Sequence, residues 1–520
     1  MKPSLLLPSL LLASLSWLAP AAEPSRPNIV IILADDLGYG DVGCYNSESK
    51  VRTPNLDRLA REGVRFTDAH SASTVCTPSR YSLMTGRMCF RTGYRGGVFS
   101  GAGGPSLIEK DRVTLPGMLR DQGYATACVG KWHIGLTFQT KDGTPVHEVK
   151  VEGNARELER MKFIDYTKPI TDGPVHRGFD YFFGTACCPG TDWLYAFIEN
   201  DRVPVPPERL LDASVLPKHP YANDCRRGWV APGFDHEMLD MVFLDKSKAW
   251  LEQQVKRAPT KPFFLDHAMQ AVHLPSFAAP QFKGKSKAGP HGDFIVELDF
   301  IVGELMATLQ KLGVADNTLI IFSSDNGPET TSVVHMRADH QHDPARPWRG
   351  VKRDSWEGGH RVPLILNWPG RIKPGVSDAT VCLTDIMATC AAITGAKLPT
   401  NAAEDSFSFL HSLTGKPSNT PQRDYTLHQT ISLAMAIRRG DWKYLDHLGS
   451  GGNGYAKGEL QPFALPDTAP TAPGQLYNLK TDPGETTNLF FKHPEIAKEL
   501  KSLLEDSKTS GRSAAAKSRP

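Results

Sequence analysis

Beyond its first 22 residues, the chain of 520 residues has no apolar run long enough to cross a membrane, which takes about 18 to 20 residues. It also has no large excess of charge of either sign, because its formal net charge is only +2. Bulk charge therefore gives no reason to expect nucleic acid or a membrane surface as a partner. We predict no membrane span in the mature chain and no nucleic acid partner.

The chain is poor in cysteine. Nine cysteines are too few for a scaffold held together by disulfides, and no C-x-x-C pair indicates zinc. The sequence also has no N-x-S/T glycosylation acceptor, which favours an exported bacterial protein over a glycosylated lysosomal one. With 40% hydrophobic and 22% charged residues, the chain is typical of globular proteins and is long enough for more than one domain.

The N-terminus has the pattern of a secretory signal peptide over residues 1–22. Lys2 gives a weakly positive start, an apolar stretch follows over residues 5–18, and A-P-A at 19–21 fits a cleavage site. A membrane anchor is the alternative, but the apolar stretch is short and is interrupted by Pro8 and by serines. We expect an exported protein, either secreted or periplasmic.

Strands and helices alternate along most of the chain. The apolar, β-branched run 29–33 predicts a strand buried on both faces, and Thr53-Pro54 and Gly63 mark the start and end of a helix. Further strands are predicted at 125–129, 262–265, 318–323 and 362–366, and further helices at 115–122, 238–255, 294–312 and 385–393. This alternation predicts an α/β domain built around a mostly parallel sheet flanked by helices.

The pattern changes after about residue 420. Residues 435–445 alternate like an exposed antiparallel strand, and 476–479 and 494–504 read as a short strand and a helix. We therefore divide the chain into a signal peptide (1–22), a main α/β domain (23–419), a smaller C-terminal α+β subdomain with a short antiparallel sheet and a helix (420–505), and a disordered tail (506–520).

Acidic residues directly follow two of the predicted strands. Asp35-Asp36 comes after 29–33, and Asp325-Asn326 comes after 318–323. Ligands of open α/β sheets bind beyond the carboxyl ends of the strands, so both pairs should reach the same edge. Either pair alone reads as a turn cap, but three carboxylates in one place repel one another unless a cation joins them. Their hard oxygen atoms predict a Ca²⁺ or Mg²⁺ site and not a zinc site.

Basic residues and histidines follow other strands. G-K-W-H-I-G at 130–135 comes directly after strand 125–129 and contains Lys131 and His133. Lys352 precedes E-G-G-H-R-V-P at 357–363, and His273 lies just past strand 262–265. An isolated lysine is by default a surface residue, and an isolated histidine is more often packed than catalytic. These residues are therefore candidates for the functional site only because of the motifs around them.

Cys76, Pro78 and Arg80 form a C-x-P-x-R pattern, and T-G-R follows at 85–87. Taken alone, Cys76 reads as a buried thiol, as half of a disulfide or as a thiolate nucleophile. Together with the motifs at 130–135 and 357–363, the pattern resembles the signature of the type I sulfatases, which are arylsulfatase-like, formylglycine-dependent enzymes of the alkaline-phosphatase-like superfamily. The resemblance covers residues 27 to about 496.

This resemblance implies an alkaline-phosphatase-like α/β fold and a sulfuric ester hydrolase. In the family, the cysteine is oxidised to formylglycine (3-oxoalanine), whose hydrate is the nucleophile beside one Ca²⁺. Carried over residue by residue, the metal ligands are Asp35, Asp36, Asp325, Asn326 and Cys76, and the catalytic residues are Cys76, Arg80, Lys131, His133, His273 and Lys352. Arg80 and the two lysines would clamp the sulfate. His273 or Lys352 would protonate the leaving alcohol, and His133 would remove the proton that expels sulfate.

The resemblance also implies substrates and partners. We expect sulfate monoesters as substrates, with sulfated polysaccharides or glycosaminoglycan fragments preferred over simple aryl sulfates, and the aromatic loop 190–195 could stack sugar rings. A formylglycine-generating enzyme or an anaerobic maturase would act on Cys76. The alternatives are a phosphomonoester or phosphonate hydrolase of the same superfamily and a non-catalytic carbohydrate-binding protein on this scaffold.

Overall fold

The computed structural model describes residues 26–153, 156–415 and 423–514. The expected signal peptide, the expected domain boundary at 419 and 420, and residues 515–520 of the expected tail lie outside these segments. Within them, no helix combines the length and the apolar character that a bilayer crossing requires.

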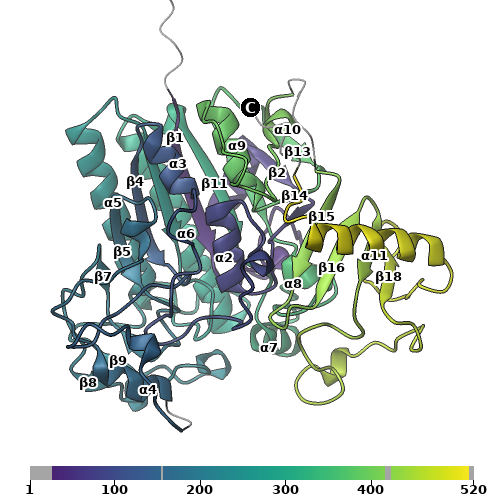
Figure 1. The fold of residues 1–520 in the computed structure, drawn as a ribbon, viewed down its shortest axis with the longest axis horizontal. Coiled ribbons are helices and arrows are strands. Elements are labelled where there is room, and N and C mark those ends of the chain that lie inside the picture. Colours follow the sequence, from purple (N-terminus) through teal and green to yellow (C-terminus); the bar gives the residue numbers. More distant parts are fainter. Residues whose placement is uncertain (1–25, 154–155, 416–422, 515–520) are drawn as a thin grey trace, which may run out of the picture.

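A nine-stranded sheet forms the centre of the protein (Figure 1). Its strands lie in the order β13 (Gly375–Ser377), β2 (Val64–Phe66), β12 (Leu364–Asn367), β11 (Thr318–Ser324), β1 (Asn28–Ala34), β10 (Phe263–Ala268), β4 (Ala125–Lys131), β5 (Tyr181–Thr185) and β7 (Ile198–Glu199). The five strands from β11 to β5 are parallel to their neighbours, whereas β12 and β7 are antiparallel additions. The predicted mostly parallel sheet is therefore confirmed.

Helices cover both faces of this sheet (Figure 1). One face carries α2 (Cys76–Thr85), α3 (Leu115–Asp121), α9 (Asp385–Thr394) and α10 (Leu410–Thr414), and the other carries α1 (Pro54–Glu62), α5 (Leu239–Arg257) and α6 (Gly289–Lys311). Along β1, Ile29, Ile31 and Leu33 pack with the first set of helices, and Val30 and Ile32 pack with the second. Burial on both faces explains why this strand is continuously apolar.

Smaller elements surround the main sheet. One short sheet pairs β3 (Ala69–His70) with β14 (Val381–Cys382), and another joins β6 (Leu194–Tyr195), β9 (Trp229–Val230) and β8 (Arg209–Leu210). The remaining helices of the main domain, among the described residues, are α4 (Arg156–Arg160), α7 (Thr330–His340) and α8 (Glu357–His360).

A four-stranded antiparallel sheet forms the C-terminal subdomain, with a long helix packed against it (Figure 1). Its elements are β15 (Tyr425–Gln429), β16 (Met435–Arg439), β17 (Trp442–Leu445), β18 (Gln475–Asn478) and α11 (Pro494–Thr509). The single exposed strand predicted at 435–445 is wrong, because Gly440, at φ 57°, turns the chain and divides it into β16 and β17. Most of β16 is also buried.

The disordered tail predicted from residue 506 is wrong for the described residues. Helix α11 continues to Thr509. Beyond it, the backbone N–H groups of Ser513 and Ala514 donate to the Glu404 carbonyl at 3.1 and 2.9 Å. These contacts with the main domain offset the entropy that ordering the segment costs, and they could not be read from local composition.

A buried lysine links the subdomain to the main domain. Lys443 of β17 is fully buried, and its Nζ lies 3.0 Å from Glu357 Oε1 and 2.9 Å from Glu485 Oε1. Glu357 begins α8 and also accepts from Arg361 Nη1 at 2.9 Å. Because removing one partner of a buried ion pair leaves a costly unpaired charge, this cluster ties β17 to the E-G-G-H-R-V-P segment.

Replacing Lys443 with Met leaves Glu357 and Glu485 buried without their shared cation. We expect Lys443→Met to lower the free energy of unfolding by about 3–5 kcal/mol, measured by urea denaturation. Arg439→Met is the matched control, because the Arg439 side chain on the neighbouring strand is 43% exposed and its ion pairs lie at the surface. Equal stability of the two variants would contradict a structural role for Lys443.

Candidate active site

The carboxyl ends of β1 and β11 bring two acidic pairs together. The strands pair in parallel with their last residues opposite each other, so Asp35 and Asp325 leave the sheet side by side. The Asp36 backbone N–H donates to Asp325 Oδ1 at 3.3 Å, and Asn326 Nδ2 donates to Asp36 Oδ1 at 2.7 Å. All four residues are buried. The two pairs therefore meet at one edge of the sheet, as the strand pattern predicts.

Two buried lysines face these carboxylates. Lys131, the last residue of β4, pairs through Nζ with Asp35 Oδ2. Lys352 Nζ donates to Asp36 Oδ2 at 2.7 Å. Both lysines are no more than 3% exposed, and a lysine is rarely buried to this extent unless it is paired. Neither lysine is therefore the solvent-exposed surface residue that an isolated lysine is by default.

The first turn of α2 sets Cys76 and Arg80 against the same acids. Cys76 is the first residue of the helix, and its sulfur lies within 4.8 Å of carboxylate oxygens of Asp35 and Asp325. Arg80 donates through Nε to Asp325 Oδ2 at 2.8 Å and through Nη1 to the Lys131 carbonyl at 3.0 Å. Residues four apart share one face of a helix, so the spacing of the C-x-P-x-R pattern presents both side chains to the site.

Two histidines complete the cluster with their proton positions defined by backbone carbonyls. His133 Nε2 lies 2.8 Å from the Phe99 carbonyl oxygen, and His273 Nδ1 lies 2.5 Å from the Leu274 carbonyl oxygen. Because a carbonyl oxygen only accepts, these nitrogens carry the protons in the neutral rings. That leaves His133 Nδ1 and His273 Nε2 free to exchange protons, and the latter lies 3.7 Å from Asp36 Oδ2.

The charges of the cluster shift its carboxyl pKa values in opposite directions. Burial raises the pKa of Asp325 well above its ordinary value and also raises the pKa of Asp36. Burial acts on Asp35 in the same sense, but Lys131 and neighbouring cations outweigh it and lower the Asp35 pKa to about 2. Of the three carboxyl groups, the surrounding protein groups therefore favour the charged form only of Asp35.

Two oxygens of the cluster are suited to bind a cation. Within the described part of the chain, neither Asp35 Oδ1 nor Asn326 Oδ1 has a hydrogen-bond partner, although both are buried. Buried polar atoms are nearly always paired. The unpaired oxygens belong to the same group as the carboxylates of Asp36 and Asp325, and such a set of hard oxygen donors fits Ca²⁺ or Mg²⁺.

The structure places all ten predicted site residues in this one cluster, namely Asp35, Asp36, Cys76, Arg80, Lys131, His133, His273, Asp325, Asn326 and Lys352. Sequence reasoning missed Glu329, which pairs with Lys352 at 3.4 Å and with Arg353 at 2.5 Å. It also missed Cys188, whose Sγ lies 3.9 Å from His133 Nδ1 and from His273 Nε2. Glu329 could have been found from its place shortly after Asp325-Asn326, whereas Cys188 belongs to no motif and its only signal is that it follows β5.

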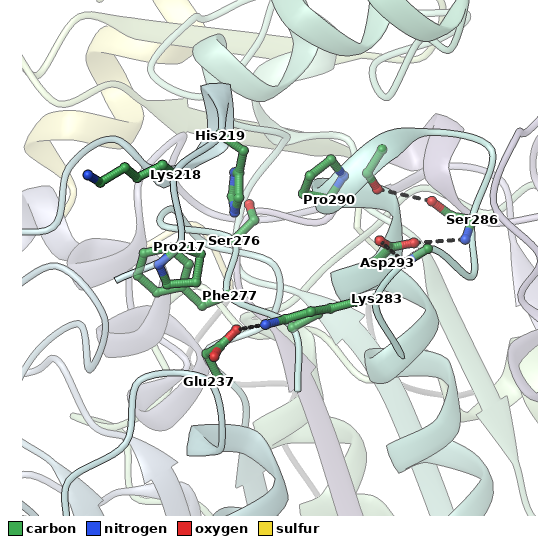
Figure 2. A pocket seen from close by; sticks show the side chains of 13 residues that line it. Pro217, Lys218, His219, Glu237, Ser276, Phe277, Lys283, Ser286, Pro290 and Asp293 are labelled. Carbon is green, nitrogen blue, oxygen red and sulfur yellow. Dashed lines mark hydrogen bonds and ion pairs between the residues drawn. The ribbon is translucent and has the colours of Figure 1, made fainter. Parts of the chain in front are cut away.

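A cavity of about 440 Å³ borders the segment that carries His273 (Figure 2). Its wall includes Ser276 and Phe277, which follow His273 in the chain, and Figure 2 shows Lys283 paired with Glu237 across it. Apolar and charged groups therefore line this cavity, and among the described residues none of the ten predicted site residues belongs to its lining.

The aromatic loop 190–195 is only partly suited to the predicted stacking of sugar rings. Tyr195 is fully buried, and its hydroxyl donates to the Arg226 carbonyl at 2.7 Å. Trp193 is half-buried, with the Arg226 guanidinium carbon 5.5 Å from its ring centre. Tyr195 is therefore a packing residue, and Trp193 is the ring of this pair that a substrate could reach.

Buried acids, cations and histidines gathered at the edge of an α/β sheet are the kinds of group that a hydrolase of anionic esters uses. The family model for sulfatases matches residues 27–396. The chain belongs to the sulfatase family and is a sulfuric ester hydrolase.

Known relatives cover nearly the whole chain. N-acetylgalactosamine-6-O-sulfatase of Bacteroides thetaiotaomicron is 35% identical over 93% of each protein, and human arylsulfatase A is 35% identical over 95% of this chain and 90% of its own. A solved sulfatase structure from work on glycosaminoglycan metabolism by Bacteroides thetaiotaomicron aligns with a TM-score of 0.76 and 33% identity, over 93% of this chain and 100% of its own. A phosphonate monoester hydrolase of Agrobacterium radiobacter shares the fold, with a TM-score of 0.58 and 18% identity over 94% of this chain and 96% of its own.

Arg80→Lys keeps the positive charge but loses the planar fork that joins Asp325 to the Lys131 carbonyl. We expect kcat/KM for 4-nitrophenyl sulfate to fall about 100- to 1,000-fold, with the fold checked by circular dichroism. Arg112→Lys is the control, because Arg112 pairs with Glu109 and Glu404 outside the cluster. Full activity of Arg80→Lys would show that the two hydrogen bonds of the Arg80 guanidinium are not needed to hold Asp325 and Lys131 in place.

Proposed function

We propose that the protein hydrolyses sulfate monoesters of carbohydrates, with residue 76 oxidised to formylglycine (3-oxoalanine) and one Ca²⁺ bound beside it. The observation that carries this proposal is the position of Cys76, whose sulfur lies within 4.8 Å of the Asp35 and Asp325 carboxylates. Its C-x-P-x-R pattern and the T-G-R at 85–87 are intact, as the resemblance requires for oxidation of the cysteine.

The ion would be held by Asp35, Asp36, Asp325 and Asn326, together with residue 76. Bound Ca²⁺ supplies Lewis acidity that draws electron density from a coordinated oxygen. With Glu329 and its partner Arg353 included, the cluster has four acidic side chains and four basic ones, the latter being Arg80, Lys131, Lys352 and Arg353. A divalent ion therefore leaves an excess of positive charge, which suits the anion of a sulfate monoester.

Arg80, Lys131 and Lys352 orient the sulfate group and balance its charge. Each lysine ammonium has three donors, so Lys131 and Lys352 keep N–H groups available besides those that bond Asp35 and Asp36. Because these residues are buried, water screens their charges little, and their interaction with charge that develops on sulfate oxygens is strong.

The two histidines and Lys352 move the protons. Lys352 Nζ, or His273 Nε2 when the ring carries a proton on both nitrogens, gives a proton to the departing alcohol oxygen as residue 76 takes over the sulfate. His133 Nδ1, whose ring is fixed by its Nε2 bond to the Phe99 carbonyl, accepts the proton from residue 76 that must leave before sulfate is released. Burial lowers the pKa of His133, which keeps this ring neutral and able to act as the base.

Maturation and export are part of the proposal. Conversion of Cys76 requires a formylglycine-generating enzyme or an anaerobic maturase as a transient partner. Residues 1–22 have the pattern of a signal peptide, and we propose a secreted or periplasmic location on that ground.

A phosphomonoester or phosphonate hydrolase is the alternative on the same fold. A two-metal phosphatase needs additional ligands for its second ion, whereas here Lys131 and Lys352 occupy the space against Asp35 and Asp36. A non-catalytic carbohydrate-binding protein is disfavoured because the nucleophile position, both lysines and all the acids are intact.

Residue 76 gives the sharpest test of this mechanism. When the protein is produced with a maturation enzyme, mass spectrometry of its residue 76 peptide should show the thiol replaced by an aldehyde, and Cys76→Ala should have no measurable activity. Cys44→Ala, which removes a thiol elsewhere in the fold, should remain active. Wild-type enzyme should prefer 4-nitrophenyl sulfate to the phosphate. An active Cys76→Ala enzyme, or the reverse preference, would refute the mechanism.

We propose a sulfated amino sugar of the glycosaminoglycan type as the substrate. A relative that is 35% identical over nearly the full length is named as an N-acetylgalactosamine-6-O-sulfatase, and a solved sulfatase structure at 33% identity comes from work on glycosaminoglycan metabolism. In a panel of position-defined sulfated sugars, we expect a higher kcat/KM for N-acetylgalactosamine 6-sulfate than for its 4-sulfate isomer or for 4-nitrophenyl sulfate. Equal turnover of all three would contradict a dedicated sugar site.

A further inference from the structure

Cys188 faces Cys76 across the active site. The two sulfurs and a ring nitrogen of His133 all lie within 4.8 Å of one another. Both cysteines are free thiols here and both are buried, at 2% and 7% exposed. Cys188 has no part in the mechanism above, so the structure places an unassigned thiol beside the residue on which activity depends.

The two thiols lie in different kinds of secondary structure. Cys76 lies in a buried helix, whereas Cys188 lies in the loop after β5, which continues into Pro189 and Gly190. The Gly190 N–H holds this loop through a bond to Gln270 Oε1 at 3.4 Å. A disulfide needs a sulfur–sulfur distance of about 2.05 Å, which rotation of both side chains and a small shift of the loop would provide.

We propose that Cys76 and Cys188 form a reversible disulfide in chains whose residue 76 has not been oxidised to formylglycine. The oxidant is a low-molecular-weight disulfide such as glutathione disulfide. The Cys76 thiolate attacks one sulfur of the oxidant, forms a mixed disulfide and releases one thiolate. The Cys188 thiol then loses its proton and its sulfur attacks the Cys76 sulfur, which forms the protein disulfide and releases the second thiolate. The two cysteine protons pass to the released thiolates, and two electrons pass to the oxidant.

The bond would keep residue 76 from activation. Conversion to formylglycine starts from a free thiol, so oxidation would remove its substrate and reduction would return it. This consequence rests on the proposed function, whereas formation of the bond does not.

The neighbouring Cys187 is the natural competitor for Cys188. It is adjacent in the chain and equally buried, but its side chain is hydrogen-bonded to Asp192. This partner favours Cys76 as the thiol that pairs with Cys188, and it makes Cys187→Ser a matched control.

The test uses the full chain produced without a maturation enzyme. Two samples are incubated in a glutathione redox buffer. One is folded protein, and the other is protein refolding from urea, in which the oxidant reaches thiols that are buried in the native state. Both are then digested without reduction and analysed by mass spectrometry. We expect a Cys76–Cys188 linked peptide that is lost in Cys188→Ser and retained in Cys187→Ser. A Cys187–Cys188 bond, or free Cys76 and Cys188 while the more exposed Cys44 or Cys225 carries glutathione, would overturn the proposal.

A second experiment tests the consequence for activation. Wild type and Cys188→Ser are each coexpressed with a maturation enzyme in an oxidising compartment, and the formylglycine fraction at residue 76 is measured by peptide mass. We expect a larger fraction in Cys188→Ser, and equal fractions would refute the block to activation. Formylglycine in neither protein would count against the proposed function and would leave the linked-peptide result standing.

Discussion

Repulsion between buried carboxylates is the constraint on which this site depends. Parallel pairing of β1 and β11 makes Asp35 and Asp325 neighbours at the sheet edge, and Asp36 follows directly. Burial raises the pKa of two of these three carboxyl groups, so the arrangement requires positive charge close by. Lys131 and Arg80 meet that requirement from β4 and α2, where they pair with Asp35 and Asp325.

A third cation, Lys352, is positioned by contacts from other parts of the fold. The E-G-G-H-R-V-P segment that follows Lys352 is anchored by Lys443 of the C-terminal subdomain, which pairs with Glu357 and Glu485 in the interior. Glu329 holds Lys352 from another side at 3.4 Å. Stability of the subdomain and geometry of the site are thereby linked through buried ion pairs, whose partners are costly to remove.

Residues that follow strands could be located from the sequence, because parallel strands end at a shared edge and Asp35 and Asp325 each come directly after an apolar run. Cys76 and Arg80 were found from the C-x-P-x-R pattern, whereas the helix that puts both side chains on one face was not predicted. Contacts made by loops could not be located in this way. Cys188 reaches the site through the path of the chain after β5, which leaves no local pattern. The turn at Gly440 did leave one, because Gly440-Asp441 between two alternating runs is a hairpin signal that the prediction overlooked.

A crystal structure of the matured protein grown with Ca²⁺ tests the central claim most directly. We expect one ion at about 2.3–2.6 Å from side-chain oxygens of the acidic and amide residues that directly follow β1 and β11, with an aldehyde or its hydrate at residue 76 beside it. A calcium ion bound elsewhere, or acids that remain closed on the two lysines with no ion between them, would contradict the claim.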